Sequence, residues 1–386
     1  MARKLTYLNN AATTWPKPSS VLKAADESFK RPYYESGRGM TNGSKDYPTL
    51  ARQALAGLYH AENPENFAFS ANATDALNTL IHGFAAKKDG RFHAITTELE
   101  HNSVLRPLYE LRRKGRIDLS VVPFDDRGHV DPAAVGEAIR DETALAVLTH
   151  GSNVMGSVQD IPRMSRILHE RGVYLVVDAA QTAGLTDIDL TILGADAFVF
   201  TGHKYLFSLP GVGGFHIRDP ESIEPIRQGG TGIRSGQEAH PIQMPYRFEA
   251  GTPNYPGIAS LCAGLRYIER RGQAKVRKKT MSLADSIIRA LAKEGNITLY
   301  NGKPDLPIIS FNIQGLDNAD VSYILLHEYG IVSRPGLHCA PLAHLRIDGG
   351  KGCVRLSPSC LNTEKECRNA QDAVREIARS PGKGKR

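Results

Sequence analysis

The sequence predicts an α/β fold, in which a mainly parallel sheet carries helices on both faces and a smaller α+β domain follows. Strand and helix patterns alternate from about residue 20 to residue 260, and such alternation is typical of parallel strands joined by crossover helices. After Pro256 the order changes to a long helical segment followed by short strands. A chain of 386 residues also exceeds one ordinary core, which favours two domains.

Short apolar runs predict the buried strands, and apolar residues at helical spacing predict the helices. In the first part we expect strands at 67–70, 91–97, 118–124, 143–150, 173–178 and 195–200, and helices at 74–86, 101–115, 131–140 and 161–172. In the second part we expect a helical segment from 257 to about 294, strands near 297–300 and 308–313, and a helix at 318–329. We assign 15–260 to a large domain, 1–14 and 261–380 to a small one, and 381–386 to a basic tail.

The composition predicts a cytoplasmic protein that binds neither membranes nor nucleic acid. The chain has no run of 18 apolar residues and no apolar signal core, which argues against a membrane span and secretion. Its net charge is +7, but no aromatic-rich or zinc-type module accompanies the basic runs. The five cysteines are odd in number and lack CxxC spacing, so we expect no disulfide framework and no metal site.

Chemically capable residues stand where several of these strands end. In open α/β sheets the carboxyl ends of the strands are where ligands bind. Each residue also has an ordinary interpretation as a helix cap, a surface side chain or a charged strand end. Together, however, they predict one cleft that holds a lysine, an acid, a planar ring and an anion-binding helix start. The residues are Asn72, Thr74, His101, Asp178 and Lys204.

This inventory is the one that pyridoxal 5'-phosphate (PLP) requires. Lys204 would form a Schiff base with the cofactor aldehyde, and Asp178 would keep the pyridine nitrogen protonated. His101 could stack on the ring, and His203 could donate to the phosphate. The glycines at 211, 213 and 214 would let the backbone pass close to the cofactor.

A series of motifs extends this interpretation over nearly the whole chain. They are LNNAATTWPKP (8–18), FSANATDALN (69–78), EHNS (100–103), HGSNVMG (150–156), VDAAQTAG (177–184), TGHKYL (201–206), FEAGTPN (248–254), RPGLHCAP (334–341) and VRLSPSCLNT (354–363). In this order they resemble the class V aminotransferases, and more narrowly the cysteine desulfurase and selenocysteine lyase branch. The resemblance implies a fold-type I PLP-dependent transferase with a seven-stranded-type sheet.

The resemblance also implies roles for individual positions in cofactor binding. Lys204 would bind PLP, Asp178 would pair with its pyridine nitrogen, Gln181 would bond its ring hydroxyl, and His101 would stack over the ring. Thr252 would reach the phosphate of the other subunit, which implies a homodimer. The phosphate would be held by Asn72, Ala73, Thr74, Thr201 and His203.

On the substrate side, Arg355 would clamp a carboxylate with help from Asn153. Asn10 and Ala11 would line this side, and Arg334 would orient the loop that carries Cys339. One departure is Leu337, which stands where desulfurases of this type carry the first histidine of a His-His-Cys segment.

Cys339 is the candidate nucleophile, because Arg334 and His338 would supply positive charge that favours a thiolate. With Lys204 and His101 it would form the catalytic set: L-cysteine would give L-alanine and a Cys339 persulfide, which a sulfur-acceptor protein would then receive. We interpret the other four cysteines as packing residues. Two alternatives stay open. One is another class V enzyme, such as a selenocysteine lyase, an aminotransferase or an epimerase, with Cys339 incidental; the other is a non-enzymatic basic dimer.

Overall fold

A computed structural model describes residues 5–30 and 45–379 of the chain, so the expected basic tail at 381–386 lies outside the described residues. The fold is α/β, as expected. A seven-stranded sheet has the strand order β2-β8-β7-β6-β5-β3-β4. All its strands run parallel except β8, which is antiparallel to both of its neighbours. The strands are β2 (Phe67–Ser70), β3 (Phe92–Thr97), β4 (Ile117–Val122), β5 (Thr143–Thr149), β6 (Tyr174–Asp178), β7 (Ala197–Thr201) and β8 (Gly213–Ile217).

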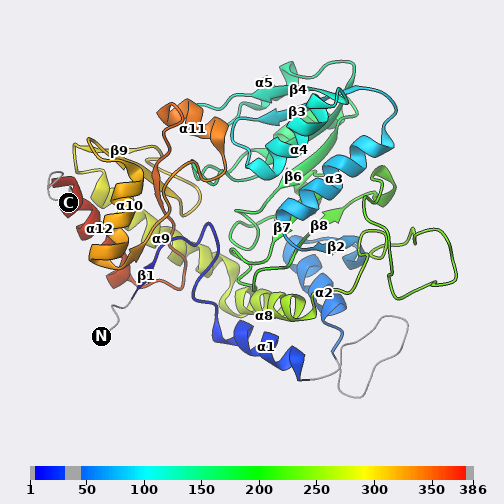
Figure 1. Ribbon diagram of the computed structural model, residues 1–386, viewed down its shortest axis with the longest axis horizontal. Helices are drawn as coiled ribbons and strands as arrows, with labels where there is room; N and C mark the ends of the chain where they lie inside the picture. Colours follow the sequence, from blue (N-terminus) through cyan, green and yellow to red (C-terminus); the bar gives the residue numbers. More distant parts are fainter. Residues whose placement is uncertain (1–4, 31–44, 380–386) are drawn as a thin grey trace.

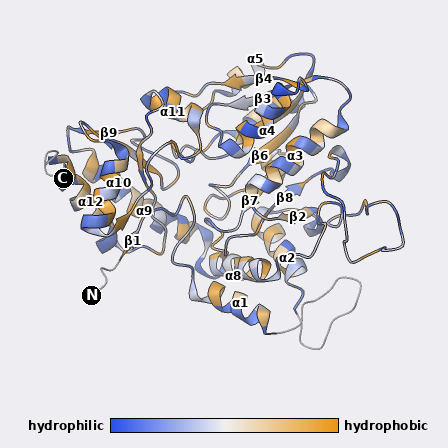
Figure 2. Cartoon of the chain, in the orientation of Figure 1, coloured by the Kyte–Doolittle hydropathy of each residue, from blue (hydrophilic) through white to orange (hydrophobic). Residues whose placement is uncertain are grey.

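Helices cover both faces of this sheet because its strands are apolar on both sides. Val176 and Val199 face a cluster with α3 and α4, whereas their neighbours Val177 and Phe198 face a second cluster with α2, α6 and α8. The helices themselves carry hydrophobic and hydrophilic residues side by side (Figure 2). They are α1 (Ser19–Phe29), α2 (Tyr47–Tyr59), η1 (Pro64–Asn66), α3 (Ala73–Lys87), α4 (Asn102–Arg113), α5 (Pro132–Glu137), α6 (Ile161–His169), α7 (Leu190–Leu193), η2 (Pro220–Ser222) and α8 (Tyr255–Arg271).

The remainder forms a smaller α+β part beside the main sheet (Figure 1). Its antiparallel sheet has the order β12-β10-β9, and a two-stranded parallel sheet joins β1 to β11. Leu8, next to β1, lies in the core of this part, so the two ends of the described chain meet in one hydrophobic cluster. The elements are β1 (Thr6–Tyr7), α9 (Gln273–Leu291), β9 (Ile297–Leu299), β10 (Ile309–Ile313), α10 (Asn318–Tyr329), β11 (Ile331–Val332), α11 (Pro341–Asp348), β12 (Val354–Leu356) and α12 (Glu364–Arg379).

Three differences from the sequence-based expectation concern the chain after Lys204. The glycine-rich stretch after Lys204 contains strand β8, where a Cβ on Gly213 would come within 2.9 Å of the Asn72 backbone. Glycine is needed there because the neighbouring backbone leaves no room for a side chain. Since glycine has a low propensity for strands, the sequence does not indicate a strand at this position. The helical segment expected from 257 to about 294 is two helices that meet at Gly272, whose φ is +78°. The expected domain boundary at residue 260 falls inside the continuous helix α8.

No helix among the described residues combines the length and the apolar character needed to cross a membrane.

Two glycines test how tightly the α8 face is packed. A Cβ on Gly264 of α8 would overlap the backbone oxygen of Leu206. A Cβ on Gly57, which is exposed on the surface of α2, would have no other atom within 4 Å. We expect Gly264→Ala to lower the free energy of unfolding by roughly 1–3 kcal/mol because of overpacking. Gly57→Ala is the matched control and should raise it by about 0.5–1 kcal/mol. Urea unfolding midpoints measure both changes, and a neutral Gly264→Ala would contradict the close contact.

Candidate active site

A cavity of about 450 Å³ opens at the carboxyl edge of the main sheet. It lies where β2, β3, β5, β6 and β7 end, which is the position that open α/β sheets use for ligands. Most of the residues predicted for the site meet here. The cavity is lined by Ala11, Ala12, Asn72, Ala73, Thr74, His101, Ser103, Thr149, Gly151, Asn153, Asp178, Ala180, Gln181, Thr201, His203, Lys204, Arg334, His338 and Arg355.

Lys204 follows β7 and is held by its backbone. Its carbonyl accepts a hydrogen bond of 2.6 Å from Thr14 Oγ1, and the carbonyl of His203 accepts one of 2.7 Å from Lys17 Nζ. The pKa of the Lys204 amine is lowered to about 8, mainly by burial; Asp178 opposes this lowering, and Arg355 and Arg334 add to it. An amine with this pKa is partly neutral near neutral pH, and a neutral amine is a nucleophile and a base.

One buried acid, Asp178, lies near this amine, and a second, Glu100, lies near Asp178. Asp178, at the end of β6, accepts a 2.9 Å hydrogen bond from the backbone N–H of Ala180, and burial raises the pKa of its carboxyl group. Glu100 is completely buried and accepts from Thr97 Oγ1 at 2.8 Å and from Thr149 N at 2.9 Å. The pKa of Glu100 is raised to about 8, mainly by burial and further by the Asp178 charge, while the hydrogen bonds from Thr149 and Thr97 oppose the increase. Glu100 is therefore mostly protonated at neutral pH.

His101 caps the start of α4 and presents a neutral ring. Its Nδ1 accepts from the backbone N–H of Ser103 at 3.1 Å, which leaves the ring proton on Nε2. Burial lowers the pKa of His101 to about 4, with Lys204 and Arg334 as the next causes. A planar, uncharged imidazole beside the amine is suited to stacking on a flat ligand.

The start of α3 forms an anion cradle. Asn72 caps the helix by accepting from Asp75 N at 3.0 Å, and the N–H groups of Ala73 and Thr74 have no acceptor within the helix. Thr74 Oγ1 shares a 2.7 Å hydrogen bond with Ser103 Oγ. Helix starts of this kind bind phosphate groups because their N–H groups and dipole face the ligand.

Two buried polar atoms of uncharged side chains at the cavity lack a partner within the part of the chain that is described. They are Gln181 Oε1 and Thr201 Oγ1, and both residues line the cavity. The other end of the Gln181 amide donates to the carbonyl of Ala11 at 3.0 Å, which fixes its orientation. A buried polar atom without a partner is costly, so a ligand with matching polar groups would stabilise this arrangement.

Two arginines also line the cavity. Arg355 on β12 is only 1% exposed and donates to the carbonyl of Asn153 at 2.8 Å, while its Nε has no partner. Its backbone pairs with that of Arg334 through hydrogen bonds of 2.8 and 3.1 Å. Among the described side chains, no carboxylate forms an ion pair with either guanidinium. Such a pair of free guanidinium groups is suited to an anionic substrate.

The loop that carries Cys339 is fixed at its carbonyls. Asn153 Nδ2 donates to His338 O at 2.7 Å, and Asn102 N donates to Cys339 O at 2.7 Å. His338 and Cys339 have φ values of +49° and +58°, a left-handed backbone that non-glycine residues rarely adopt. This strain is typical of functional loops.

The cysteine is half-buried and contacts a cation. Arg334 Nη2 lies 3.6 Å from Cys339 Sγ. The expectation that His338 adds a second positive charge here is wrong, because burial lowers the pKa of His338 to about 2 and the ring is neutral. Arg334 is thus the charged group beside the sulfur.

Three predicted residues do not line the cavity. Asn10 is buried and donates to Ser357 O at 2.9 Å and Asn362 Oδ1 at 3.3 Å, so its side chain joins the N-terminal segment to the small part. Thr252 is exposed on a loop. Cys339 does not line the cavity itself but contacts Arg334, which does. Sequence reasoning missed Glu100 and Ser103, although both lie in the EHNS motif; the signal for Glu100 is a carboxylate in the short turn between strand β3 and helix α4.

Comparisons with known proteins agree with this geometry. The chain matches the aminotransferase class-V family over residues 6–369. It is similar to a "Probable cysteine desulfurase" of Methanothermobacter thermautotrophicus, with 32% identity over 98% of this chain and 96% of the relative. A second "Probable cysteine desulfurase", from Pyrococcus abyssi, is 31% identical over 98% of this chain and 96% of the relative. The apo structure of a cysteine desulfurase from Thermococcus onnurineus NA1 has a TM-score of 0.89 at 28% identity, covering 97% of this chain and 95% of that chain.

The raised pKa of Glu100 predicts a pH-dependent stability difference. The folded pKa of about 8 exceeds the ordinary value of 4.5, so the native state binds a proton that the unfolded state has lost. The wild type should therefore lose stability relative to Glu100→Gln as pH rises between 4.5 and about 8, by about 1.4 kcal/mol per pH unit. Urea unfolding across this range measures the difference, and a constant difference would mean that Glu100 is ionised in the native state.

Proposed function

The chain belongs to the aminotransferase class-V family, whose enzymes use PLP, and from this premise we propose that it is a PLP-dependent cysteine desulfurase. In the proposed reaction L-cysteine becomes L-alanine, and its sulfur passes to Cys339 as a persulfide. The names of the relatives support the substrate. The observation that carries the proposal is the contact of Arg334 with Cys339 Sγ at the rim of a cavity containing Lys204 and Asp178.

The residues of the cavity fit PLP. When bound, PLP supplies an electrophilic aldehyde carbon and a pyridinium ring that withdraws electrons. Lys204 Nζ would bind the aldehyde carbon, and Asp178 would hold a proton at the ring nitrogen. The unpaired Gln181 Oε1 would accept from the ring hydroxyl, and His101 would cover the ring face.

The phosphate site follows from the same fit. The start of α3, with Asn72, Ala73 and Thr74, would bind the phosphate together with Thr201 and His203. Thr201 Oγ1 is a buried hydroxyl without a partner, and a phosphate oxygen would satisfy it. Burial lowers the pKa of His203 to about 4, so His203 would donate as a neutral imidazole.

The chain's own groups would then bind and deprotonate the substrate. Arg355, with Arg334 and Asn153, would hold the substrate carboxylate, which orients the Cα–H bond. Lys204, with a pKa of about 8, would take the proton from Cα and return it as general base and acid. Ala11 lies on the substrate side of the cavity.

Cys339 would complete the reaction. Its sulfur forms a bond to the substrate sulfur while the Cβ–S bond breaks, and the carbon fragment takes up a proton. One cysteine and one thiol thus give one alanine and one persulfide, with no oxidant required. The positive charge of Arg334 would stabilise the negative charge on the attacking sulfur.

The proposal includes a homodimer and a later sulfur acceptor. Thr252 is exposed and does not line the cavity of its own chain. It is therefore available to bind the phosphate in the partner's site, as the resemblance implies. The persulfide on Cys339 would pass to an acceptor protein.

Replacing Cys339 tests the reaction. We expect Cys339→Ala to lower alanine formation from L-cysteine by about 10³-fold or more, because the nucleophile is lost. The variant should keep the visible absorption of lysine-bound PLP, because Lys204 is intact. The measurement is an anaerobic assay of alanine and enzyme-bound persulfide.

Cys367→Ala, which removes a buried cysteine of α12, is the matched control and should keep most of the activity. Unchanged alanine and persulfide output from Cys339→Ala would reject the desulfurase proposal and favour another class V reaction. An assay with L-selenocysteine separates the lyase alternative: turnover of selenocysteine alone would identify a selenocysteine lyase.

A further inference from the structure

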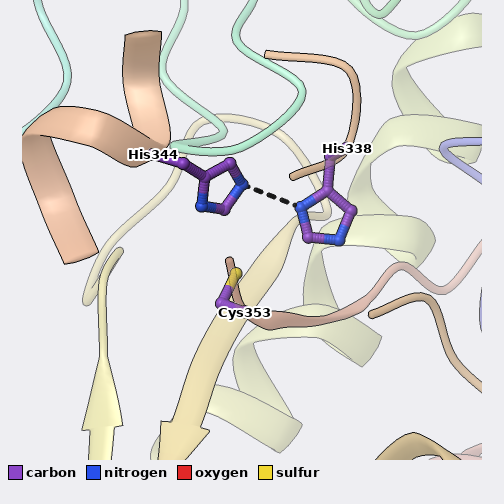
Figure 3. Close-up of side chains that lie close together, drawn as sticks. All are labelled: His338, His344 and Cys353. Carbon is purple, nitrogen blue, oxygen red and sulfur yellow. Dashed lines mark hydrogen bonds between the residues drawn. The ribbon is translucent and has the colours of Figure 1, made fainter. Parts of the chain in front are cut away.

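A cluster of three metal-ligating side chains lies behind the loop that carries Cys339. His338 comes from that loop, His344 from α11, and Cys353 from the residue before β12. Their donor atoms all lie within 4.8 Å of one another, and the cysteine sulfur points toward the gap between the two rings (Figure 3). All three side chains are buried.

The hydrogen bonds of the two rings fix where their protons are. His338 Nε2 faces the carbonyl of Arg334 at 3.0 Å, and because a carbonyl only accepts, this nitrogen carries a proton. His344 Nδ1 faces the Asp348 carboxylate at 2.6 Å and therefore carries a proton too. In neutral rings, the remaining nitrogens, His338 Nδ1 and His344 Nε2, are both lone-pair acceptors.

These two acceptors nevertheless face each other at 3.1 Å. Either a second proton on one ring or a cation bound to both nitrogens removes the repulsion. Cys353 favours the cation, because its sulfur lies within 4.8 Å of both ring nitrogens and would complete a three-ligand set. Two nitrogens 3.1 Å apart can both lie about 2.0–2.1 Å from one zinc ion.

The surroundings match those of a metal site. A ligating histidine usually donates its other ring N–H to a carboxylate or a backbone carbonyl, and both rings do so here. The Asp348 carboxylate is only 2% exposed and needs a compensating positive charge. A divalent cation would balance the charges of the Asp348 carboxylate and a Cys353 thiolate.

We propose that His338, His344 and Cys353 bind Zn²⁺, with Asp348 and the Arg334 carbonyl orienting the two rings. Zinc accepts imidazole and thiolate together and imposes no ligand-field geometry. Its fourth position would take a water molecule, as in zinc sites with three protein ligands. Such a site would differ from our expectation of no metal site, because its ligands lack CxxC spacing and converge only through the fold.

The ion would join three segments around the nucleophile loop. The turn between α11 and β12 contains Gly352, where a Cβ would come within 2.7 Å of the Gly336 backbone. Cys353 and Gly336 exchange backbone hydrogen bonds of 3.1 and 3.2 Å. This backbone pairing holds Cys353 close to His338, the residue before Cys339. A zinc ion bound to both would therefore restrict the movement of the loop that carries Cys339.

Metal analysis of the purified full chain with its cofactor tests the proposal. We expect about one zinc ion per chain after dialysis. Cys353→Ala and His344→Gln should lose it, whereas Cys367→Ala, which removes another buried cysteine of the same part, should retain it. Cys339→Ala should also retain it, which separates this site from the proposed nucleophile. The visible cofactor absorption of each variant confirms that it is folded.

Cobalt provides a second measurement that needs no variant. Co²⁺ bound in place of zinc in the wild type should give a thiolate charge-transfer band and the d–d bands of a four-coordinate site. A wild-type protein that contains no zinc and takes up neither Zn²⁺ nor Co²⁺ would overturn the proposal and assign a second proton to the His338–His344 contact. Zinc retained by Cys353→Ala, or cobalt spectra without a thiolate band, would overturn it as well.

Discussion

The candidate site depends on placing an amine and a carboxylate together at one buried sheet edge. Parallel strands β6 and β7 are neighbours in register, with Asp178 opposite Val199, so the chain beyond each strand enters the same cavity. Burial opposes charge on both groups, lowering the pKa of Lys204 and raising that of Asp178. Their mutual attraction partly offsets this cost. Burial of the apolar strands between helices on both faces stabilises the fold enough to offset the remaining destabilisation.

Burial sets the protonation state of the other titratable groups around this pair. Glu100 is kept protonated by burial, and His101 and His203 are kept neutral. The guanidinium groups of Arg334 and Arg355 remain cationic and line the cavity together with the Lys204 amine. The start of α3 and the two arginines therefore give the cavity two separate groups of anion-binding donors.

Much of this site could be predicted from the sequence, because its residues directly follow apolar strands or start helices. Asp178, Lys204 and Thr74 are examples in which strand order alone implies convergence. Properties that depend on three-dimensional packing could not be predicted. The pKa of His338 is set by burial among segments distant in sequence, and β8 is masked by glycines that its neighbours require. The buried His338–His344–Cys353 cluster likewise follows from a turn and a backbone pairing that no local pattern reveals.

The stretch from Leu8 to Lys17 touches both parts of the molecule. Leu8 lies in the small core, Asn10 is bonded to Ser357, and Thr14 and Lys17 hold the carbonyls of Lys204 and His203. The support of the reactive amine therefore extends mechanically to the smaller sheet. A displacement of the smaller part would therefore reach the amine through fewer than a dozen residues (Leu8–Lys17).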